Sequence, residues 1–435
     1  MFFEYKFTAP GCTWPRLQER LTSLTSFTAV SLLPGMDLNS DAAGPKSDQI
    51  SRLPSSLTRL SLNFPRAESC WAISNYAGAA FPTEIPTLMS LYVPMSEILP
   101  NLLTLELAGA ESVLDDWVPT LPRTLTSLTL KNNNRLTDVC VPNLPPGMTI
   151  LNLPHNDRLT GLGLKRLPLS KLTLSGKALA PNLLISGLSM CLEDLELPHN
   201  THMNNDDIAK LPRSIARLSL PANSTIKGDA FSLLSPGLTS LTTAADINDA
   251  DILRLPKHMI TLALHRCSKL SNEAIGYLPR TLTLFSAWNA ANITDEAIPL
   301  LPKSLKYLYL DAPNLTDECA PFLPSTLLEL KIQTVPLTDN FFAAIRLPNL
   351  VRLELSGARA VSDHSISLLP PNLRYLHLPS AEELTQACMH DIPRTLEIFV
   401  AWSSQGFTWI PPTLKYFYSA DLTLLPGVFS APVKS

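Results

Sequence analysis

Leucines and other apolar residues return along this chain in one spaced phrase, Leu-Pro-x-x-Leu-x-x-Leu-x-Leu, with polar residues between them. Clear copies begin at Leu121, Leu144, Leu211, Leu301 and Leu369. The final leucine of the phrase moves from position 130 to position 153, a step of 153 − 130 = 23 residues. A repeat of this length is typical of a solenoid, in which each unit covers the apolar edge of the next.

Each repeat contains three parts with different expected structures. The Leu-x-x-Leu-x-Leu segment alternates like a short strand, so its leucines should point inward and equivalent strands should pair in parallel. Asn follows three residues later in several units, at positions 133, 156, 200 and 223, where its amide can satisfy backbone groups at a buried bend. Cys267 takes that place in one unit, and Ala110, Pro313, Val335, Ala358 and Ala381 take it in others, which predicts that the Asn ladder is broken towards the C-terminus.

A hydroxyl residue followed by Asp or Asn opens the third part of the repeat. The pairs begin at Thr137, Ser271, Thr294, Thr316, Thr338 and Ser362. A hydroxyl at the N-cap and an acid in the first turn favour the start of a helix. Because another proline soon follows, we expect only one or two turns of α- or 3₁₀-helix, or less, on the outer side.

The repeat is regular only in the middle of the chain, which suggests a three-part organisation. We expect an irregular N-terminal cap or segment over residues 1–50, a solenoid over 51–420 and a C-terminal cap or tail over 421–435. Caps are needed because the two ends of a solenoid would otherwise leave apolar edges open.

The Leu-x-x-Leu-x-Leu-x-x-Asn/Cys pattern resembles that of the leucine-rich repeat family. The segment Leu315-Thr316-Asp317-Glu318-Cys319 is similar to the cysteine-containing class found in ubiquitin-ligase substrate receptors, and Leu121-Pro122-Arg123-Thr124-Leu125 is more like FNIP-type repeats. The resemblance implies an α/β solenoid of horseshoe shape, with a parallel β-sheet on the concave face and short helical or irregular turns on the convex face. The sequence shows neither an F-box before the repeats nor a ligase domain after them.

Composition and charge narrow the classes of partner. The net charge is −4, and the charged residues assigned to the inner sheet face balance, so no nucleic-acid partner is expected. No apolar run approaches the roughly 20 residues of a membrane span, and the first residues do not resemble a signal peptide. We therefore expect a cytoplasmic protein without a membrane partner. The seven cysteines are scattered without C-x-x-C spacing, which favours inert core thiols.

Catalytic and metal-binding signatures are missing from the sequence. It contains no phosphate-binding loop, no dinucleotide fingerprint, no His-Glu-x-x-His and no Gly-x-Ser-x-Gly. His155 and His199 occupy equivalent turns two rungs apart, which is too far for a shared zinc ion. The expectation is a protein that is not an enzyme and that has neither a metal nor a cofactor.

Aromatic residues are unevenly distributed over the predicted inner face and gather in the C-terminal repeats. The candidate partner-binding residues are Trp288, Tyr307, Tyr309, Asp311, Tyr375, His377, Trp402, Tyr416 and Tyr418. Tyr and Trp are enriched at interface hot spots because they bury much area at little cost in rotamer entropy. The alternative is that these rings only stabilise an exposed sheet by packing across strands, and a small-ligand site is a third reading.

These observations lead to one functional hypothesis and one alternative. The hypothesis is a non-enzymatic scaffold that binds a protein or peptide on the concave face of the repeats. The alternative is a substrate-recognition adaptor or effector within a larger assembly such as a ubiquitin ligase, with residues 1–50 as its docking segment. The sequence assigns neither the identity of the partner nor the oligomeric state.

Overall fold

The computed structural model describes residues 26–29, 55–63, 95–108, 113–175, 177, 188–223, 225–401, 407, 409–418 and 423–424. Two compact units are present, and each is described here by itself. The first comprises residues 1–203 and 210–222, and the second comprises residues 204–209 and 223–435.

The first unit is an α/β solenoid whose strands pair in parallel in chain order from β1 to β8. Its strands are β1 (Ser26–Ala29), β2 (Arg59–Asn63), β3 (Thr104–Ala108), β4 (Ser127–Lys131), β5 (Ile150–Leu153), β6 (Lys171–Leu174), β7 (Asp194–Glu196) and β8 (Arg217–Leu220). Its outer elements are α3 (Met95–Ile98) and three 3₁₀-helices, η3 (Asp115–Thr120), η4 (Asp138–Asn143) and η5 (Leu164–Arg166).

The second unit repeats this architecture, with parallel pairing from β9 to β17 and an antiparallel β18 beside β17. Its strands are β9 (Ser240–Thr243), β10 (Thr261–Leu264), β11 (Leu284–Ala287), β12 (Tyr307–Asp311), β13 (Glu329–Gln333), β14 (Arg352–Leu355), β15 (Tyr375–Leu378), β16 (Ile398–Ala401), β17 (Tyr416–Tyr418) and β18 (Thr423–Leu424). Its outer elements are α5 (Asn205–Ala209), α6 (Ala230–Leu233), α7 (Asp249–Arg254), α8 (Asn272–Gly276), η6 (Asp295–Leu300), η7 (Asp317–Phe322), α9 (Asp339–Ala344), α10 (Asp363–Ser367) and η8 (Gln386–His390).

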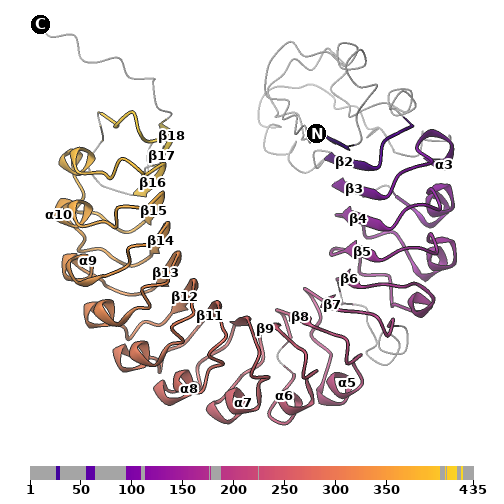
Figure 1. Ribbon diagram of the computed structural model, residues 1–435, viewed down its shortest axis with the longest axis horizontal. Helices are drawn as coiled ribbons and strands as arrows, with labels where there is room; N and C mark the ends of the chain where they lie inside the picture. Colours follow the sequence, from indigo (N-terminus) through magenta and orange to yellow (C-terminus); the bar gives the residue numbers. More distant parts are fainter. Residues whose placement is uncertain are drawn as a thin grey trace, which may run out of the picture. The chain divides into compact units, whose positions relative to one another are not determined.

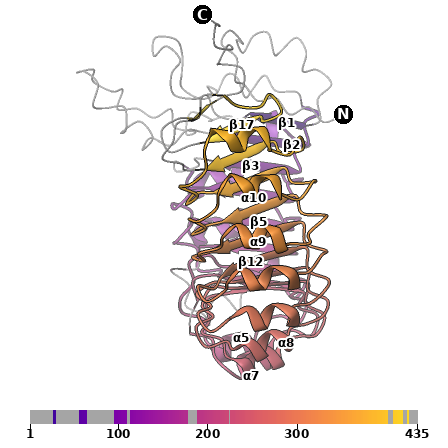
Figure 2. The same cartoon turned by 90° about the vertical axis from the view of Figure 1, so that its left-hand side faces the viewer.

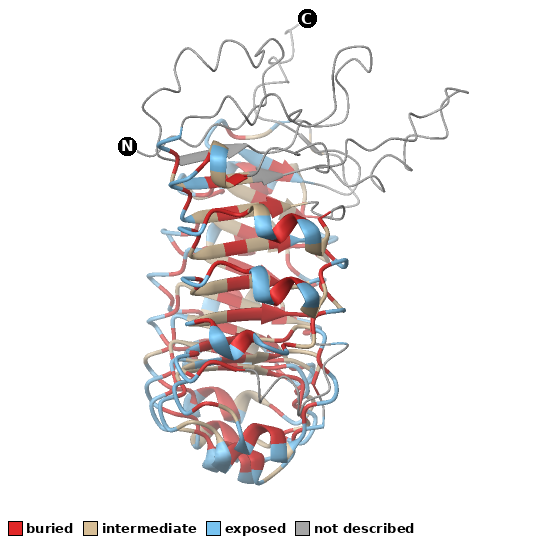
Figure 3. Cartoon of the chain, turned by 90° about the vertical axis from the view of Figure 1, so that its right-hand side faces the viewer, coloured by how far each residue is buried: buried red, intermediate tan, exposed pale blue. Residues whose placement is uncertain are grey.

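The core of each unit lies between the strands and the outer elements, which occupy opposite sides (Figure 1). The leucines of the repeat fill this core: Leu308 and Leu376 have no exposed surface, and their neighbours along each strand are partly exposed. Figure 3 shows the buried residues along the strands and the inner sides of the turns. The strand register predicted from the leucines is therefore confirmed.

The predicted Asn ladder is present, and Asn133 and Asn156 show its hydrogen bonds. The Asn156 amide donates to the carbonyl of Leu136 at 2.9 Å, and its Oδ1 accepts the backbone N–H of Leu159 at 2.8 Å. Buried Val335, Ala358 and Ala381 replace Asn later in the chain, as predicted. Pro313 was wrongly assigned to this position, because Pro313 is exposed and Ala312 is the buried residue.

Five of the six hydroxyl residues predicted to begin an outer element cap it. Thr316 accepts the backbone N–H of Glu318 at 3.2 Å, and Thr338, Ser271, Thr137 and Ser362 cap their elements in the same way. Thr294 does not cap η6, because its hydroxyl accepts the Asn272 side-chain amide at 2.8 Å. Proline lies within several of the 3₁₀-helices, which the sequence pattern did not predict.

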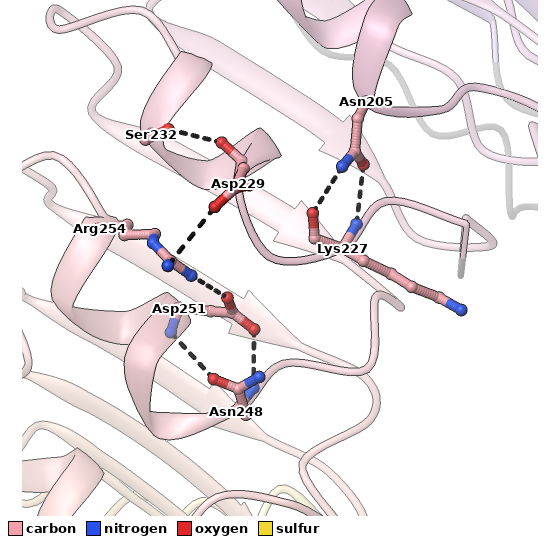
Figure 4. A network of polar contacts seen from close by, with 7 residues as sticks. All are labelled: Asn205, Lys227, Asp229, Ser232, Asn248, Asp251 and Arg254. Carbon is pink, nitrogen blue, oxygen red and sulfur yellow. Dashed lines mark hydrogen bonds and ion pairs between the residues drawn. The ribbon is translucent and has the colours of Figure 1, made fainter.

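The acid of each hydroxyl–acid pair joins neighbouring repeats, a role that the sequence did not reveal. Asp317 accepts the backbone N–H of Thr338 at 2.9 Å through Oδ1 and the Thr338 hydroxyl at 2.6 Å through Oδ2. Asp295 holds Thr316 in the same way. Asn205 is an amide version, since it both accepts from and donates to the backbone of Lys227 (Figure 4).

Loss of one such acid should destabilise the second unit measurably. We expect Asp317→Ala to lower the free energy of unfolding by about 1–3 kcal/mol, because the Thr338 donors lose their partners. Asp317→Asn should cost less, since Asn272 in the equivalent position still accepts the Thr294 N–H at 2.9 Å. Chemical denaturation measures both, with exposed Glu318→Ala as the control. If all three variants were equally stable, the hydrogen bonds between Asp317 and Thr338 would not contribute to stability.

Cysteines are mostly buried, with one exception to the prediction. Cys140, Cys267, Cys319 and Cys388 are buried free thiols, and burial raises the pKa of each to about 12. Cys191 is exposed, because it lies in the turn that precedes β7 rather than in the core. Cys12 and Cys70 lie outside the described residues.

Candidate functional site

The strand face of the second unit brings most of the predicted site residues into two rows. In the row that precedes the first buried leucine, Tyr307, Glu329, Arg352 and Tyr375 stand side by side on β12 to β15. In the row between the buried positions, Tyr309, Lys331, Glu354 and His377 do the same. The rows arise because alternate residues of a strand point to opposite faces.

Glu354 is the centre of this face. Its carboxylate accepts Arg352 Nε at 2.7 Å and lies 3.0 Å from Lys331 Nζ, and its side chain is only 9% exposed. Burial raises the pKa of this carboxyl, but the hydrogen bonds and charges of Arg352 and Lys331 outweigh burial and leave the pKa below its usual value. Glu354 is therefore a charged, doubly paired group at neutral pH.

Both cations that hold Glu354 also contact aromatic rings. The Arg352 guanidinium carbon lies 3.8 Å from the centre of the Tyr375 ring, and Lys331 Nζ lies 5.7 Å from that of Trp288. Such cation–π contacts orient the rings, because the guanidinium or ammonium group is attracted to the ring face. Tyr375 and Trp288 are thus held in place by the same network that holds Glu354.

Tyr309 is fixed by a second carboxylate on the neighbouring strand. Its hydroxyl donates to Glu329 Oε2 at 2.9 Å. Burial, followed by this hydrogen bond and the negative charge of Glu329, raises the pKa of Tyr309 above its ordinary value. The phenol therefore remains protonated and a donor throughout the neutral range.

His377 completes the row beside Glu354. Its Nδ1 lies 4.0 Å from Glu354 Oε2, a separation that would count as an ion pair if the imidazole were protonated. Burial lowers the pKa of His377, and the positive charges of Lys331 and Arg352 oppose the effect of Glu354. The imidazole is consequently neutral near pH 7 and adds no formal charge to the face.

Tyr416 and Tyr418 on β17 are the most open aromatic residues of the face. They are 44% and 38% exposed, and their rings are nearly parallel, with 16° between the planes and 6.5 Å between the centroids. Strand pairing places them in line with Ile398 and Val400 on β16. Their rings therefore present free surface to solvent beside a patch without formal charge.

Asp311 and Trp402, the remaining predicted residues, do not join the network in the same way. Asp311 accepts the backbone N–H of Asn289 at 3.1 Å and the Thr334 hydroxyl at 2.6 Å, so both carboxylate oxygens hold turns. Asn289 and Thr334 each have a positive φ, which gives Asp311 a clear role in the turns between repeats. Trp402 lies outside the described residues.

The sequence predicted that the charges of this face balance, but it did not predict how the charged residues are arranged. Glu354, Lys331 and Arg352 were counted only as part of a neutral balance. A signal was available in the sequence. Lys331 and Glu354 are 23 residues apart, which is one repeat, so they occupy adjacent positions of one row. The ion pairs and ring contacts depend on side-chain rotamers that the spacing does not determine.

The strand face of the first unit is also balanced by ion pairs. Lys131 contacts Glu106 at 2.6 Å, and Asp194 lies 3.0 Å from Lys171 and 3.1 Å from Arg217. Each of these pairs joins two neighbouring strands. Lys131, Lys171 and Arg217 are therefore each paired with a carboxylate on this face.

Two kinds of feature are absent from the described residues. These contain no group of three or more His, Cys, Asp or Glu side chains placed to hold a metal ion. None of their helices is both long enough and apolar enough to cross a membrane.

The repeat register, parallel sheet and short outer elements define a leucine-rich-repeat solenoid. Comparisons with protein-family models and with curated proteins found no match. Solved structures with similar folds include a leucine-rich repeat protein of Leptospira interrogans, with 17% identity, 93% of this chain and 95% of that chain covered, and a TM-score of 0.45.

Two further structures show the same kind of similarity. The Rad7–Elc1 complex of yeast matches with 22% identity, 80% of this chain and 76% of that chain covered, and a TM-score of 0.39. The leucine-rich repeat-containing protein LegL7 of Legionella pneumophila matches with 14% identity, 49% of this chain and 83% of that chain covered, and a TM-score of 0.33.

Proposed function

We propose that the protein is a non-enzymatic scaffold that binds a protein or peptide on the strand face of its second unit. The contact surface is an uncharged block on β15 to β17. It consists of Tyr375, His377, Ile398, Val400, Tyr416 and Tyr418, which strand pairing arranges as two rows of three. The main support for the proposal is that Tyr416 and Tyr418, on β17, are the most exposed aromatic residues of this face.

Binding explains these two tyrosines better than sheet stabilisation does. A stabilising ring packs against a neighbour across the sheet, as Tyr375 does against Arg352. Tyr416 and Tyr418 instead lie beside each other on one strand and leave 44% and 38% of their surface open. Exposed aromatic residues with a hydroxyl donor are the type of residue that dominates protein interfaces.

The surroundings of the block indicate what kind of segment it fits. The Lys331–Glu354–Arg352 network supports one side, and Glu397 lies on its other border, 2.7 Å from Lys415 and 3.6 Å from Arg374. Because these charges are already paired, they offer little net attraction to a strongly charged partner. We propose a partner segment with apolar or aromatic side chains flanked by polar residues.

The test is selection of binding peptides from a random library displayed on phage, with the full chain as the target. We expect Tyr416→Ala/Tyr418→Ala to weaken binding of the selected peptides at least about a hundredfold, the effect of one hot spot or two. Trp409→Ala is the matched control, since Trp409 is equally exposed, at 43%, but stacks on His390 outside the strand face. Circular dichroism checks that each variant is folded.

Two outcomes would overturn the proposed site. One is that the selected peptides bind the double variant as tightly as the parent chain. The other is that Trp409→Ala removes binding while Tyr416→Ala/Tyr418→Ala does not.

We also propose that the repeats are of the cysteine-containing type. Cys140, Cys319 and Cys388 each follow the capping Thr by three residues and are fully buried in the outer element. Three equivalent buried thiols support this subclass over the FNIP-type alternative. The adaptor hypothesis depends on residues 1–50, of which only β1 is described, and no observation favours it.

A further inference from the structure

An exposed apolar line runs over four successive outer elements of the second unit, on the side opposite the strand face. Its members are Leu253, Tyr277, Leu300 and Phe322, which are 50%, 42%, 38% and 50% exposed. Each stands at or next to the end of its outer element. We call these four residues the outer ridge.

The ridge is not required by the core. In each of these elements other apolar residues, such as Ile252, Ile275 and Ile298, are buried and fill the space behind the strands. Leu300 lies close to the preceding element, since a side chain at Gly276 would meet its Cδ1 at 3.8 Å. Leu300 thus lies beside the residue that precedes Tyr277. We infer from the repeated placement of the four residues that they form one apolar strip rather than isolated exposed side chains.

A line of carboxylates accompanies the ridge on one side. Glu273, Glu296 and Glu318 are all exposed, and each precedes its ridge residue by four positions at the start of the outer element. Glu273 and Glu318 make no ion pair in the part of the chain that the structure describes. Within the described ranges, Glu296 accepts a single side-chain donor, the amide of Asn272 at 3.3 Å.

A line of cations accompanies the ridge on the other side. Lys257, Arg280 and Lys303 each follow the proline after a ridge residue and are exposed. Lys257 donates to the carbonyl of Leu253 at 3.2 Å, and Arg280 donates to Gly276 and Leu300 at 3.1 and 3.0 Å. These contacts fix Lys257 and Arg280 at the carboxyl ends of the outer elements, where the helix dipole favours positive charge.

We propose that the outer ridge is an interface between two copies of this chain. The three parallel lines are acidic, apolar and basic in that order. A two-fold axis parallel to the ridge would place the acidic line of each copy on the basic line of the other and bring the two apolar lines together. The surface is therefore complementary to itself, which is the requirement of an isologous dimer.

On α7, the cation next to the ridge residue Leu253 is already neutralised. Arg254 links Asp251 at 3.2 Å with Asp229 at 3.5 Å, and Asp251 completes the cap of α7 with Asn248 (Figure 4). The carboxylate line proposed for the contact begins with Glu273 on α8. Figure 2 shows α7, α8, α9 and α10 on this side of the second unit, and η6 and η7 lie between α8 and α9 in chain order.

Sedimentation velocity over a wide range of protein concentration tests the proposal. The parent chain should form a dimer whose fraction rises with concentration. Glu273→Lys/Glu296→Lys/Glu318→Lys and, separately, Lys257→Glu/Lys303→Glu should each weaken the dimer at least about tenfold, because like charges then face each other. Arg280 is left unchanged in the second variant because it also caps two outer elements.

Mixing the two variants provides the decisive measurement. The Glu→Lys variant then carries two basic lines, and the Lys→Glu variant carries mainly acidic lines. The mixture should therefore form a heterodimer at least as stable as the parent dimer. Arg394→Glu, a charge reversal after a proline beyond the ridge, is the control and should dimerise like the parent. A parent chain that stays monomeric at every concentration, or a mixture that shows no recovery, would overturn the interface.

Discussion

Replacing Leu308 with Asp is expected to abolish the stability of the second unit. Leu308 has no exposed surface and pairs in register with buried Phe285 on β11 and Leu330 on β13. A carboxylate in this place would be surrounded by apolar side chains without a partner, which costs about 5 kcal/mol or more. That cost is comparable to the whole stability of many domains.

The effect should spread beyond one repeat because each unit of a solenoid is stabilised mainly by its neighbours. We expect circular dichroism to show loss of strand signal at ambient temperature, or a melting transition lowered by tens of degrees. Lys306→Asp introduces the same side chain two residues earlier at an exposed position and serves as the control. A melt of Leu308→Asp close to that of the parent would mean that the strand register is wrong.

This register is the part of the fold that could be predicted most completely. The Leu-x-x-Leu-x-Leu phrase defines buried positions because apolar side chains are favoured there, and successive strands joined by an outer element pair in parallel. The Asn ladder was predictable for the same reason, since a buried amide at a bend has few possible partners. The error at Pro313 arose where the repeat shortens to 332 − 310 = 22 residues, because the bend then absorbs the missing residue at Ala312.

Contacts between repeats were harder to predict than positions within one. Asp317 looks in the sequence like an acid in the first turn of a helix, and the structure adds hydrogen bonds to Thr338 in the next repeat. The face of β12 to β15 presents the same difficulty. The sequence placed Tyr375 and Arg352 on one surface, but their stacking depends on the rotamers of long side chains and on the charge of Glu354.

Glu354 is the residue of this face on which stability should depend most strongly. Glu354→Gln keeps the shape of the side chain but removes the charge that holds Lys331 and Arg352. Because those cations remain half-exposed and can be partly solvated, we expect a loss of about 1–3 kcal/mol rather than the larger cost of a fully buried pair. Tyr375 should also lose order, since Arg352 positions its ring.

The loss should depend on pH in a defined direction. The pKa of Glu354 is lower in the folded protein than its ordinary value of 4.5, so its charge stabilises the fold fully above pH 4.5. This contribution disappears as the pH falls through the folded pKa, where the carboxyl becomes protonated in both states. The difference in urea midpoint between the parent and Glu354→Gln should therefore be largest near pH 7 and shrink steadily below pH 4.5.

A carboxylate that is more exposed than Glu354 separates this effect from general acid sensitivity. Glu397 pairs with Lys415 and Arg374 at the edge of the same sheet face, but in solvent, where salt and water weaken such pairs. Glu397→Gln should hence shift the urea midpoint little at any pH. If Glu354→Gln and Glu397→Gln behaved alike, or if the Glu354 difference persisted unchanged in acid, the charged centre would not hold the aromatic face together. The outcome also bears on binding, because an aromatic face without its anchor would have to be ordered by the partner at the expense of affinity.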